Sequence, residues 1–291
     1  MGRDLKEGNG IYTSVPSLVK AQNRIPGVRS LLWSAAEKSP EQFMDDLDSS
    51  IPDVVVFHEV YYRRYLRLAD ILYQRKIPYI VTPRCSLTHM AQRQRRIAKM
   101  VLNRLFFRRF LQRAAAICFL NEEEKRSSIQ IGTSAIMVPN GIEIPEKPFR
   151  RERGNVKLVY LSRIDYYHKG LDLLLEAVRI MGRRYFEEHR VQLDIYGGGL
   201  KRDLERLERD LRKLDNPFVQ YHGPAFGVKK EAALNEGNIF VLTSRFEGMP
   251  IAVLEALAHG LPCVVTPGTN MADELAAGKV GWAAEPVPES I

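Results

Sequence analysis

The chain has 291 residues, of which 45% are hydrophobic, and its formal net charge is +8. This length favours one large or two medium domains, and the apolar content excludes a mainly disordered chain. Nowhere do about 18 apolar residues run together, so the sequence predicts no membrane-spanning helix.

The cysteines and the N-terminus bear on where the protein works. Cys85, Cys118 and Cys263 are widely spaced and lie mostly in apolar runs, which is typical of buried free thiols rather than of metal ligands or disulfides. The first eight residues contain no apolar core of a signal peptide. Together these features predict a cytoplasmic protein.

The positive charge is confined to the first half of the chain. Residues 1–140 contain 22 Lys and Arg against 13 Asp and Glu, whereas residues 141–291 contain 21 against 22. We therefore expect an acidic partner, if there is one, to meet the first half.

Near its N-terminus the chain has two glycines, Gly8 and Gly10, in a predicted loop that leads into a predicted helix. Such a loop normally follows a strand, and only seven residues precede this one. The strand is either absent from this chain, or the loop is no more than a flexible terminus. Both interpretations stay open at the level of sequence.

Strands and helices then alternate as far as residue 138. Short apolar runs predict strands at 53–58, 78–83, 115–120 and 134–138, with helices at 61–74 and 92–113 between them. A turn after the second strand carries Arg84, Ser86, Thr88 and His89. This alternation predicts a parallel sheet with helices on both faces.

Residues 139–148 have turn chemistry throughout and end the basic half, so we expect the interdomain linker there. The predicted domains are thus 1–140 and 141–291. The second domain repeats the alternation, with predicted strands at 156–161, 191–196, 218–222, 238–242 and 261–265 and helices between them. Two such open parallel sheets predict ligand binding at the carboxyl ends of strands and in the cleft between domains.

A stretch at 244–260 stands out in the second domain. Pro250 suits the first position of a helix and Gly260 suits the residue just past its end. The helix start at Gly248, Met249 and Pro250 would present backbone N–H groups and a positive dipole end to an anion. Two carboxylates, Glu247 and Glu255, flank this anion site. The combination is expected if the ligand brings both phosphate and hydroxyl groups.

Four motifs carry a recognisable pattern. They are S-R-I at 162–164 with K-G-L-D-L-L at 169–174, D-I-Y-G-G-G at 194–199, P-N-G-I at 139–142, and the E-x7-E pair at 247 and 255 within E-G-M-P and L-E-A-L-A-H-G-L-P. Over residues 8–285 the chain resembles retaining GT-B glycosyltransferases, specifically glycosyltransferase family four, the group 1 glycosyl transferases. The resemblance implies the GT-B fold, an α/β architecture of two Rossmann-like parallel-sheet domains that face a cleft.

The resemblance also implies a nucleotide diphosphate-sugar donor. Arg163 and Lys169 are expected to neutralise the leaving diphosphate, together with the helix start at 248–250, so that no metal or other cofactor is required. Glu247 is expected to bind hydroxyl groups of the donor sugar, and Glu255 those of the ribose. The remaining donor-binding candidates are Gly197, Gly8 and Gly10. Replacing Glu247 or Lys169 is expected to abolish transfer with thermal unfolding nearly unchanged.

Each of these residues also has an ordinary structural interpretation. Arg163 could pair with Asp165 at the surface, Lys169 could be a solvated lysine before a helix, and Glu255 could be an exposed helix carboxylate. The order and spacing of the four motifs favour the functional interpretation over these.

The first half offers weaker candidates for the acceptor side. His58 ends one predicted strand, and Arg84 and His89 follow the next, so all three could line the cleft. A histidine in such a place is more often a structural residue than a functional one. Cys85 stands where the family often carries glycine, which leaves the shape of this turn open.

The predicted helix at 92–113 carries eight basic residues and no acidic one: Arg93, Arg95, Arg96, Lys99, Arg104, Arg108, Arg109 and Arg113. An apolar stripe runs between them. The helix could be a core helix with a solvated face, a surface that docks on an anionic membrane, or a nucleic-acid contact. No RNA or DNA motif accompanies the charge, so nucleic acid is not expected as a partner.

The sequence therefore predicts a retaining glycosyltransferase with a lipid-linked or polysaccharide acceptor, cytoplasmic or peripheral on the inner face of a membrane. Two alternatives remain. One is another enzyme of this fold, a nucleotide-sugar epimerase or a phosphorylase. The other is an inactive fragment, since the resemblance implies a first strand before residue 8 and further helices after Ile291.

Overall fold

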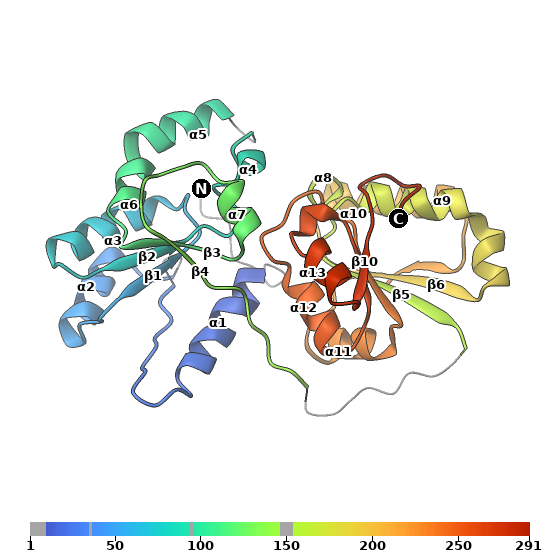
Figure 1. Ribbon diagram of the computed structural model, residues 1–291, viewed down its shortest axis with the longest axis horizontal. Coiled ribbons are helices and arrows are strands. Elements are labelled where there is room, and N and C mark those ends of the chain that lie inside the picture. The colour runs from blue at the N-terminus through green and yellow to red at the C-terminus, as the bar shows by residue number, and fades with distance from the viewer. Residues whose placement is uncertain (1–9, 35–36, 94–95, 146–153) are drawn as a thin grey trace. The chain divides into compact units, whose positions relative to one another are not determined.

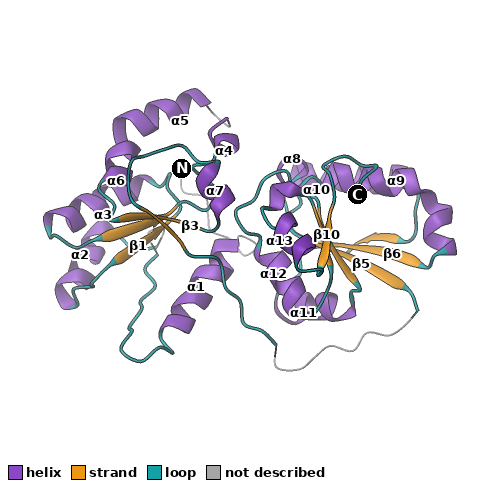
Figure 2. Ribbon diagram, viewed as in Figure 1, coloured by secondary structure: helices purple, strands orange, loops and turns teal. Residues whose placement is uncertain are grey.

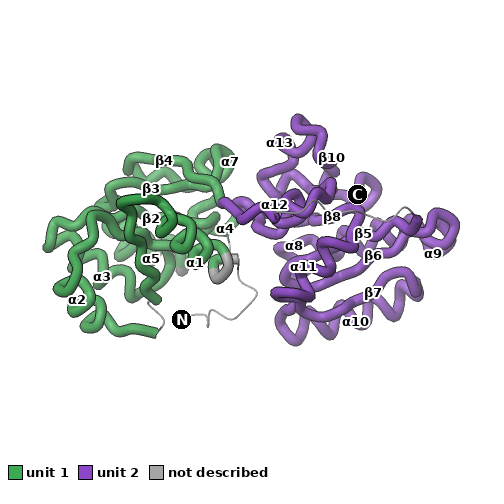
Figure 3. The backbone as a smooth tube through the Cα atoms, turned by 90° about the horizontal axis from the view of Figure 1, so that it is seen from below, with its two compact units in different colours: residues 1–6, 11–140 green, residues 7–10, 141–291 purple. Residues whose placement is uncertain are grey.

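The computed structural model describes residues 10–34, 37–93, 96–145 and 154–291. The chain divides into two compact units: residues 11–140 belong to the first, and residue 10 with the described residues from 141 onward to the second (Figure 3). Residues 139–145, at the junction, contain neither helix nor strand. Each unit is an α/β layer structure, with helices beside a twisted sheet (Figure 2).

The first unit contains a four-stranded parallel sheet in the order β1-β2-β3-β4. The strands are β1 (Val55–His58), β2 (Tyr79–Thr82), β3 (Ala116–Phe119) and β4 (Ala135–Met137). All four lie within the runs predicted from sequence. The helices are α1 (Gly10–Gln22), α2 (Pro40–Ser49), α3 (Arg63–Gln74), α4 (His89–Arg93), α5 (Arg96–Leu102), η1 (Asn103–Phe107), α6 (Arg108–Gln112) and α7 (Glu122–Arg126).

The basic helix differs from the single α-helix expected over 92–113. Its described part passes from α5 through a π-helical turn, η1, into α6. A π turn inserts an extra residue and so rotates the faces before and after it relative to each other. Figure 1 shows α5 and α6 in green at the outer side of the first unit.

Aromatic side chains fill the core of the first unit. The rings of Phe57, Tyr79 and Phe110 contact one another with centroids 5.4–5.6 Å apart. The Tyr79 hydroxyl donates to the Phe110 carbonyl at 2.6 Å, so its polar end is satisfied inside the core. This packing holds the helical segment after β2 against the sheet.

The second unit contains a six-stranded parallel sheet in the order β10-β9-β8-β5-β6-β7. The strands are β5 (Val156–Leu161), β6 (Val191–Tyr196), β7 (Val219–Tyr221), β8 (Ile239–Leu242), β9 (Cys263–Val265) and β10 (Gly281–Ala283). In chain order this is 3-2-1-4-5-6 read from β7, the doubly wound order of dinucleotide-binding folds. β10 was not predicted from sequence.

The helices of this unit are α8 (Tyr166–Lys169), α9 (Leu171–Glu188), α10 (Lys201–Leu214), α11 (Gly227–Glu236), α12 (Ile251–Ala258), η2 (Pro267–Thr269) and α13 (Ala272–Ala277). The sequence predicts a helix at 170–181 after the first strand of this unit; α9 extends beyond residue 181, with a break at Gly182, where φ is 74°. Pro250 is the N-cap of α12 rather than its first residue. Gly260 follows the helix with φ of 69°, as a glycine past a helix end should.

The central strands explain why this half could be predicted so closely. Val159, Tyr160, Leu193 and Ile195 are fully buried, because helices cover both faces of the sheet. Such strands appear in sequence as short continuous apolar runs. Within the described residues, no helix has the length and apolarity needed to cross a membrane.

Candidate functional site

The strand order of the second unit creates a switch point between β5 and β8. The chain proceeds from β5 to β6 on one side, and from β8 to β9 on the other, although β5 and β8 are hydrogen-bonded neighbours. Loops that leave two such strands at their carboxyl ends diverge and leave a crevice, where open α/β sheets bind ligands. The loops here are residues 162–170 and 243–250.

Backbone contacts hold these two loops together. Gly170 has φ of 61°, and a Cβ on it would lie 2.0 Å from the Thr243 carbonyl oxygen. The Thr243 hydroxyl donates to the Gly170 carbonyl at 2.9 Å, and the Arg245 N–H donates to the His168 carbonyl at 2.9 Å. Only glycine permits this approach, which explains the K-G pair of the motif.

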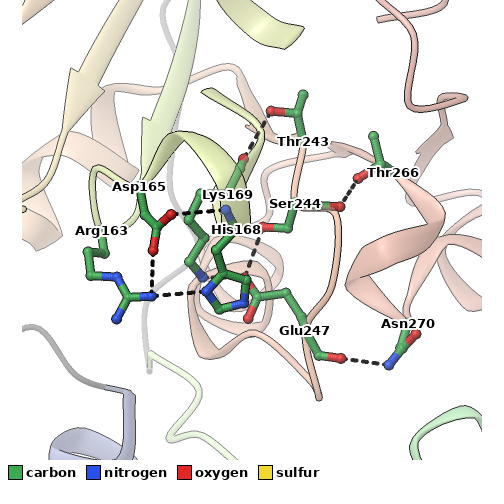
Figure 4. A network of polar contacts seen from close by, with 9 residues as sticks. All are labelled: Arg163, Asp165, His168, Lys169, Thr243, Ser244, Glu247, Thr266 and Asn270. Carbon is green, nitrogen blue, oxygen red and sulfur yellow. Dashed lines mark hydrogen bonds and ion pairs between the residues drawn. The ribbon is translucent and has the colours of Figure 1, made fainter. Parts of the chain in front are cut away.

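An ion pair between Lys169 and Glu247 lies at the centre of the site (Figure 4). Their side chains are only 13% and 12% exposed. The Ser244 hydroxyl also donates to Glu247 Oε1, at 2.9 Å. Lys169 is therefore not a solvated lysine, and the two charges come from segments 78 residues apart in the chain.

The environment of Glu247 favours its ionised form. Burial raises the pKa of this carboxyl, but the charge of Lys169 acts against burial. The hydrogen bonds from Lys169 and Ser244 add to this effect, and the net pKa lies below its ordinary value. Glu247 is thus an anion that can accept hydrogen bonds from hydroxyl groups.

Arg163 lies at the more exposed side of the same site. It donates to Asp165 at 3.0 Å, as the structural interpretation expected, and to His168 Nδ1 at 2.9 Å. Burial is the main cause that lowers the pKa of His168, and the neutral ring accepts this bond because arginine can only donate. The ring stacks on Phe246 at 4.2 Å. The Arg163 side chain remains 42% exposed, so it is accessible to an anion.

The loop after β9 also contacts the site, through hydrogen bonds to the backbone of the loop after β8. Asn270, with φ of 55°, donates from its amide to the Glu247 carbonyl at 2.7 Å. The Thr266 hydroxyl donates to the Ser244 carbonyl at 2.6 Å. Both residues follow β9, so the loop after β9 determines the backbone path of the loop after β8 (Figure 4).

Glu255 is less exposed than a surface carboxylate. It lies on α12 and forms an ion pair with Lys230 of α11 at 2.6 Å, and its side chain is 16% exposed. Gly248, Met249 and Pro250 lead into the same helix. The first amides of a helix have no acceptor within it, so this end can bind an anion.

Gly197 joins the site from the end of β6. A Cβ at Gly197 would lie 1.8 Å from the Ser162 carbonyl oxygen, and one at Gly199 would lie 2.5 Å from the Ile164 carbonyl oxygen. The Ile164 N–H donates to the Gly198 carbonyl at 2.8 Å. The glycine-rich turn therefore lies against the backbone on both sides of Arg163.

The acceptor-side candidates lie in the first unit. His58 ends β1 and Arg84 follows β2, and Arg84 Nε donates to His58 Nδ1 at 3.4 Å. Arg84 also donates to Asn140 at 3.2 Å. His89 begins α4 with an exposed side chain, and the described hydrogen bonds of this cluster do not include it. The structure thus brings two of the three candidates together.

The turn that contains Cys85 is held by a buried carboxylate. Cys85 and Arg84 have φ of 66° and 49°, values that favour glycine. Glu124, fully buried, accepts from the Cys85 N–H at 2.5 Å and from the Leu120 N–H at 2.7 Å. These bonds explain how cysteine is accommodated where the resembled family often carries glycine.

His58 is expected to make stability depend on pH. Burial, with Arg84, lowers the pKa of His58 to about 4 from an unfolded value of 6.5. The unfolded chain therefore binds the proton first, and unfolding free energy should fall as pH drops from about 6.5 to about 4, by about 3 kcal/mol at most. His58→Gln should flatten this dependence in urea titrations. An NMR titration of His58 with a midpoint near its ordinary value would contradict the prediction.

Two further donor-side candidates lie near the start of the chain and stay predictions. Gly8 lies outside the described residues, and Gly10 is the first residue of α1. Among the described residues, no group of three or more His, Cys, Asp or Glu side chains could hold a metal ion.

Several residues of the site were not predicted from the sequence. The Ser244 hydroxyl donates to the Glu247 carboxylate, and the Asn270 amide donates to the Glu247 carbonyl. His168 accepts a hydrogen bond from Arg163, and Lys230 pairs with Glu255. Ser244 and His168 lie within a few residues of motif positions, which is a usable signal. Lys230 and Asn270 lie in segments with no motif, and only the folded sheet brings them near.

Comparisons with known proteins bear on both units. Residues 155–291 match the family model described as glycosyl transferases group 1. One component of the phosphatidylinositol N-acetylglucosaminyltransferase of Arabidopsis thaliana is 29% identical over 157 residues, which are 52% of this chain and 34% of that protein. WcaL of Salmonella typhimurium, named for colanic acid biosynthesis, is 31% identical over 128 residues, 42% of this chain and 30% of that protein. The chain thus spans about a third of the length of these relatives.

Solved structures share the fold at low sequence identity. Sucrose-phosphate synthase from Thermosynechococcus elongatus aligns with a TM-score of 0.66 at 15% identity, covering 86% of this chain and 65% of that one. Anabaena HepE in complex with UDP and glucose aligns with a TM-score of 0.61 at 16% identity, covering 90% and 72%. The chain therefore has the GT-B fold of glycosyltransferases, and its second unit matches the group 1 glycosyl transferases.

Proposed function

We propose that the chain is a glycosyltransferase that moves a sugar from a nucleotide diphosphate-sugar to a lipid-linked or polysaccharide acceptor. The observation that carries the proposal is the nearly buried pair of Lys169 and Glu247 at the switch point of the second sheet. A cation and an anion at this place suit a ligand with both phosphate and hydroxyl groups.

Departure of the diphosphate builds negative charge at one end of the site. Arg163, with an accessible guanidinium, and Lys169 are the side chains proposed to stabilise it. The first amides of α12 add partial positive charge. The proposal assigns no divalent cation or other cofactor to this task, so EDTA is expected to leave donor binding unchanged.

The carboxylates are proposed to bind hydroxyl groups. Glu247, held anionic, would accept from the donor sugar, and Glu255 from the ribose. Each carboxylate is paired with a lysine in the structure. A bound donor would replace part of these pairs, because the phosphates offer Lys169 a second anionic partner. Retention of configuration is proposed on the motif resemblance, and NMR of the anomeric proton in the product tests it.

The acceptor class is proposed from the names of relatives. One is named for phosphatidylinositol as the recipient of N-acetylglucosamine, and another for biosynthesis of a polysaccharide, colanic acid. The first unit would contact the acceptor through Arg84 and His58, whose side chains meet at the carboxyl ends of β1 and β2. His89 is the third candidate on that side.

Nucleotide binding provides the direct test. In isothermal titration against UDP, GDP and ADP with EDTA present, we expect one of them to bind, and UDP is the first choice because HepE was solved with UDP. Lys169→Ala should weaken binding by about tenfold or more. Lys213→Ala, which removes an exposed lysine near the end of α10, is the matched control and should change binding less than twofold.

Binding of none of these nucleotides to the wild type would contradict the proposal and favour an inactive chain. Product analysis separates the other alternative. Release of the nucleoside diphosphate with a new glycosidic bond supports transfer, whereas an epimerised sugar, or a sugar phosphate from phosphorolysis, would identify an epimerase or a phosphorylase.

A further inference from the structure

The segment α5–η1–α6 of the first unit presents an unusual surface. Its exposed apolar side chains include Ile97 at 75%, Leu105 at 63% and Met100 at 61% exposure. Exposed arginines, Arg104, Arg108 and Arg109, lie among them. Exposed apolar patches of this kind mark interaction sites in soluble domains.

The opposite face of the same segment is well packed. Phe107 is buried against the ring of Tyr61 at 5.2 Å, and Asn103 donates to Gln92 at 3.1 Å. Lys99 donates to the Ala91 carbonyl and lies 5.2 Å from the centroid of the Tyr61 ring. The helix is therefore anchored to the unit by one face, and its apolar outer residues are not needed for that anchoring.

Apolar and basic side chains share the outer face. Val101, Leu105 and Phe106 are 45%, 63% and 51% exposed. Arg104 lies between Val101 and Leu105 in the chain, Arg108 and Arg109 follow Phe106, and all three arginines are exposed. Within the described parts of the chain, no ion pair joins Arg104, Arg108 or Arg109 to a carboxylate, and the predicted helix at 92–113 has no acidic residue. This face is thus both apolar and strongly cationic.

We propose that the outer face of α5–η1–α6 docks on an anionic lipid surface. A lipid bilayer offers what both kinds of side chain require: acyl chains for Ile97 and Leu105, and anionic headgroups for the arginines. A nucleic acid would neutralise the arginines but leave the apolar side chains in water. A second copy of the chain would set the same cations against each other. Of these three partners, only an anionic membrane therefore suits both the apolar and the basic side chains of this face.

The test is co-sedimentation of the full chain with vesicles. One set contains phosphatidylcholine alone, and the other contains about 30% phosphatidylglycerol, both at about 0.1 M salt. We expect at least tenfold stronger binding to the anionic vesicles, reduced at about 0.5 M salt. The assay needs no nucleotide, so its outcome is independent of the donor-site proposal.

Matched variants separate charge from apolarity. The triple change Arg104→Gln, Arg108→Gln and Arg109→Gln should reduce binding to anionic vesicles by at least tenfold. Ile97→Ser with Leu105→Ser should reduce it by about fivefold or more. The control removes three exposed charges from the last turns of α10, as Arg209→Gln, Arg212→Gln and Lys213→Gln, and should change binding less than twofold. All replaced side chains are exposed, so unchanged thermal unfolding verifies that each variant is folded.

Three results would overturn the proposal. The first is equal binding to neutral and anionic vesicles, and the second is wild-type binding by the triple variant. The third is no binding to vesicles of either kind. RNA binding that the arginine changes abolish would then assign the face to a nucleic acid, and self-association that Ile97→Ser and Leu105→Ser abolish would assign it to a second copy.

Discussion

Glu247→Gln is expected to lower kcat/KM for sugar transfer by about 10³-fold, and Lys169→Met by about 10²–10³-fold. Glutamine keeps the shape and the partnership with Ser244 but removes the negative charge that the site stabilises. Methionine keeps the volume of lysine but cannot neutralise a leaving diphosphate. Initial rates with a nucleotide-sugar, over a range of donor concentrations, give kcat and KM separately. Activity of Glu247→Gln within tenfold of wild type would remove Glu247 from the mechanism.

The structure changes what these variants should do to stability. The sequence alone predicted nearly unchanged thermal unfolding, but both side chains are almost buried. Removing one partner leaves the other charge buried and unpaired, which we expect to cost about 1–3 kcal/mol here. The double variant, Lys169→Met with Glu247→Gln, should recover part of that cost without recovering activity. Denaturant titrations of the singles and the double measure the coupling, and strict additivity would contradict the pairing.

Gly197→Ala should destabilise the second unit by about 3 kcal/mol or more. The new Cβ would lie 1.8 Å from the Ser162 carbonyl oxygen, and no rotamer change can relieve a clash with backbone. Either the turn after β6 or the loop that carries Arg163 must move. In calorimetry the unfolding temperature should fall by about 6–12 °C. Nucleotide binding should weaken as well, because Arg163 shifts with the loop.

The neighbouring glycine provides the control. A Cβ at Gly198 would meet only the Cβ of Pro224, at 3.8 Å, which is ordinary contact. Gly198→Ala is therefore expected to change stability by less than about 1 kcal/mol. Equal effects of the two alanines would show that the close approach of Gly197 to Ser162 does not matter energetically.

Some strands and some site residues could be predicted because neighbouring residues in the chain determine them. β5 and β6 begin and end where the sequence predicted, since strands covered on both faces are mostly apolar. Glu247 and Lys169 could be singled out because each is part of a motif with turn residues at fixed spacing. β10 was missed because it has only three residues, 281–283, and two of them, Trp282 and Ala283, are exposed at the sheet edge. The π turn in the basic helix has no signal in helical periodicity.

By itself the sequence determined the α/β alternation, the basic first half and the motif residues that make up the candidate site. Only the tertiary structure decided that β5 lies beside β8, which places Lys169 against Glu247 across 78 residues of chain. It likewise placed Lys230 against Glu255, and Asn270 against the backbone of Glu247. The physical reason is that the pattern of apolar residues predicts which residues are buried but does not predict the order of the strands in the sheet. Strand order depends on how all the helices pack over the sheet, and the partners of the site charges depend on that order.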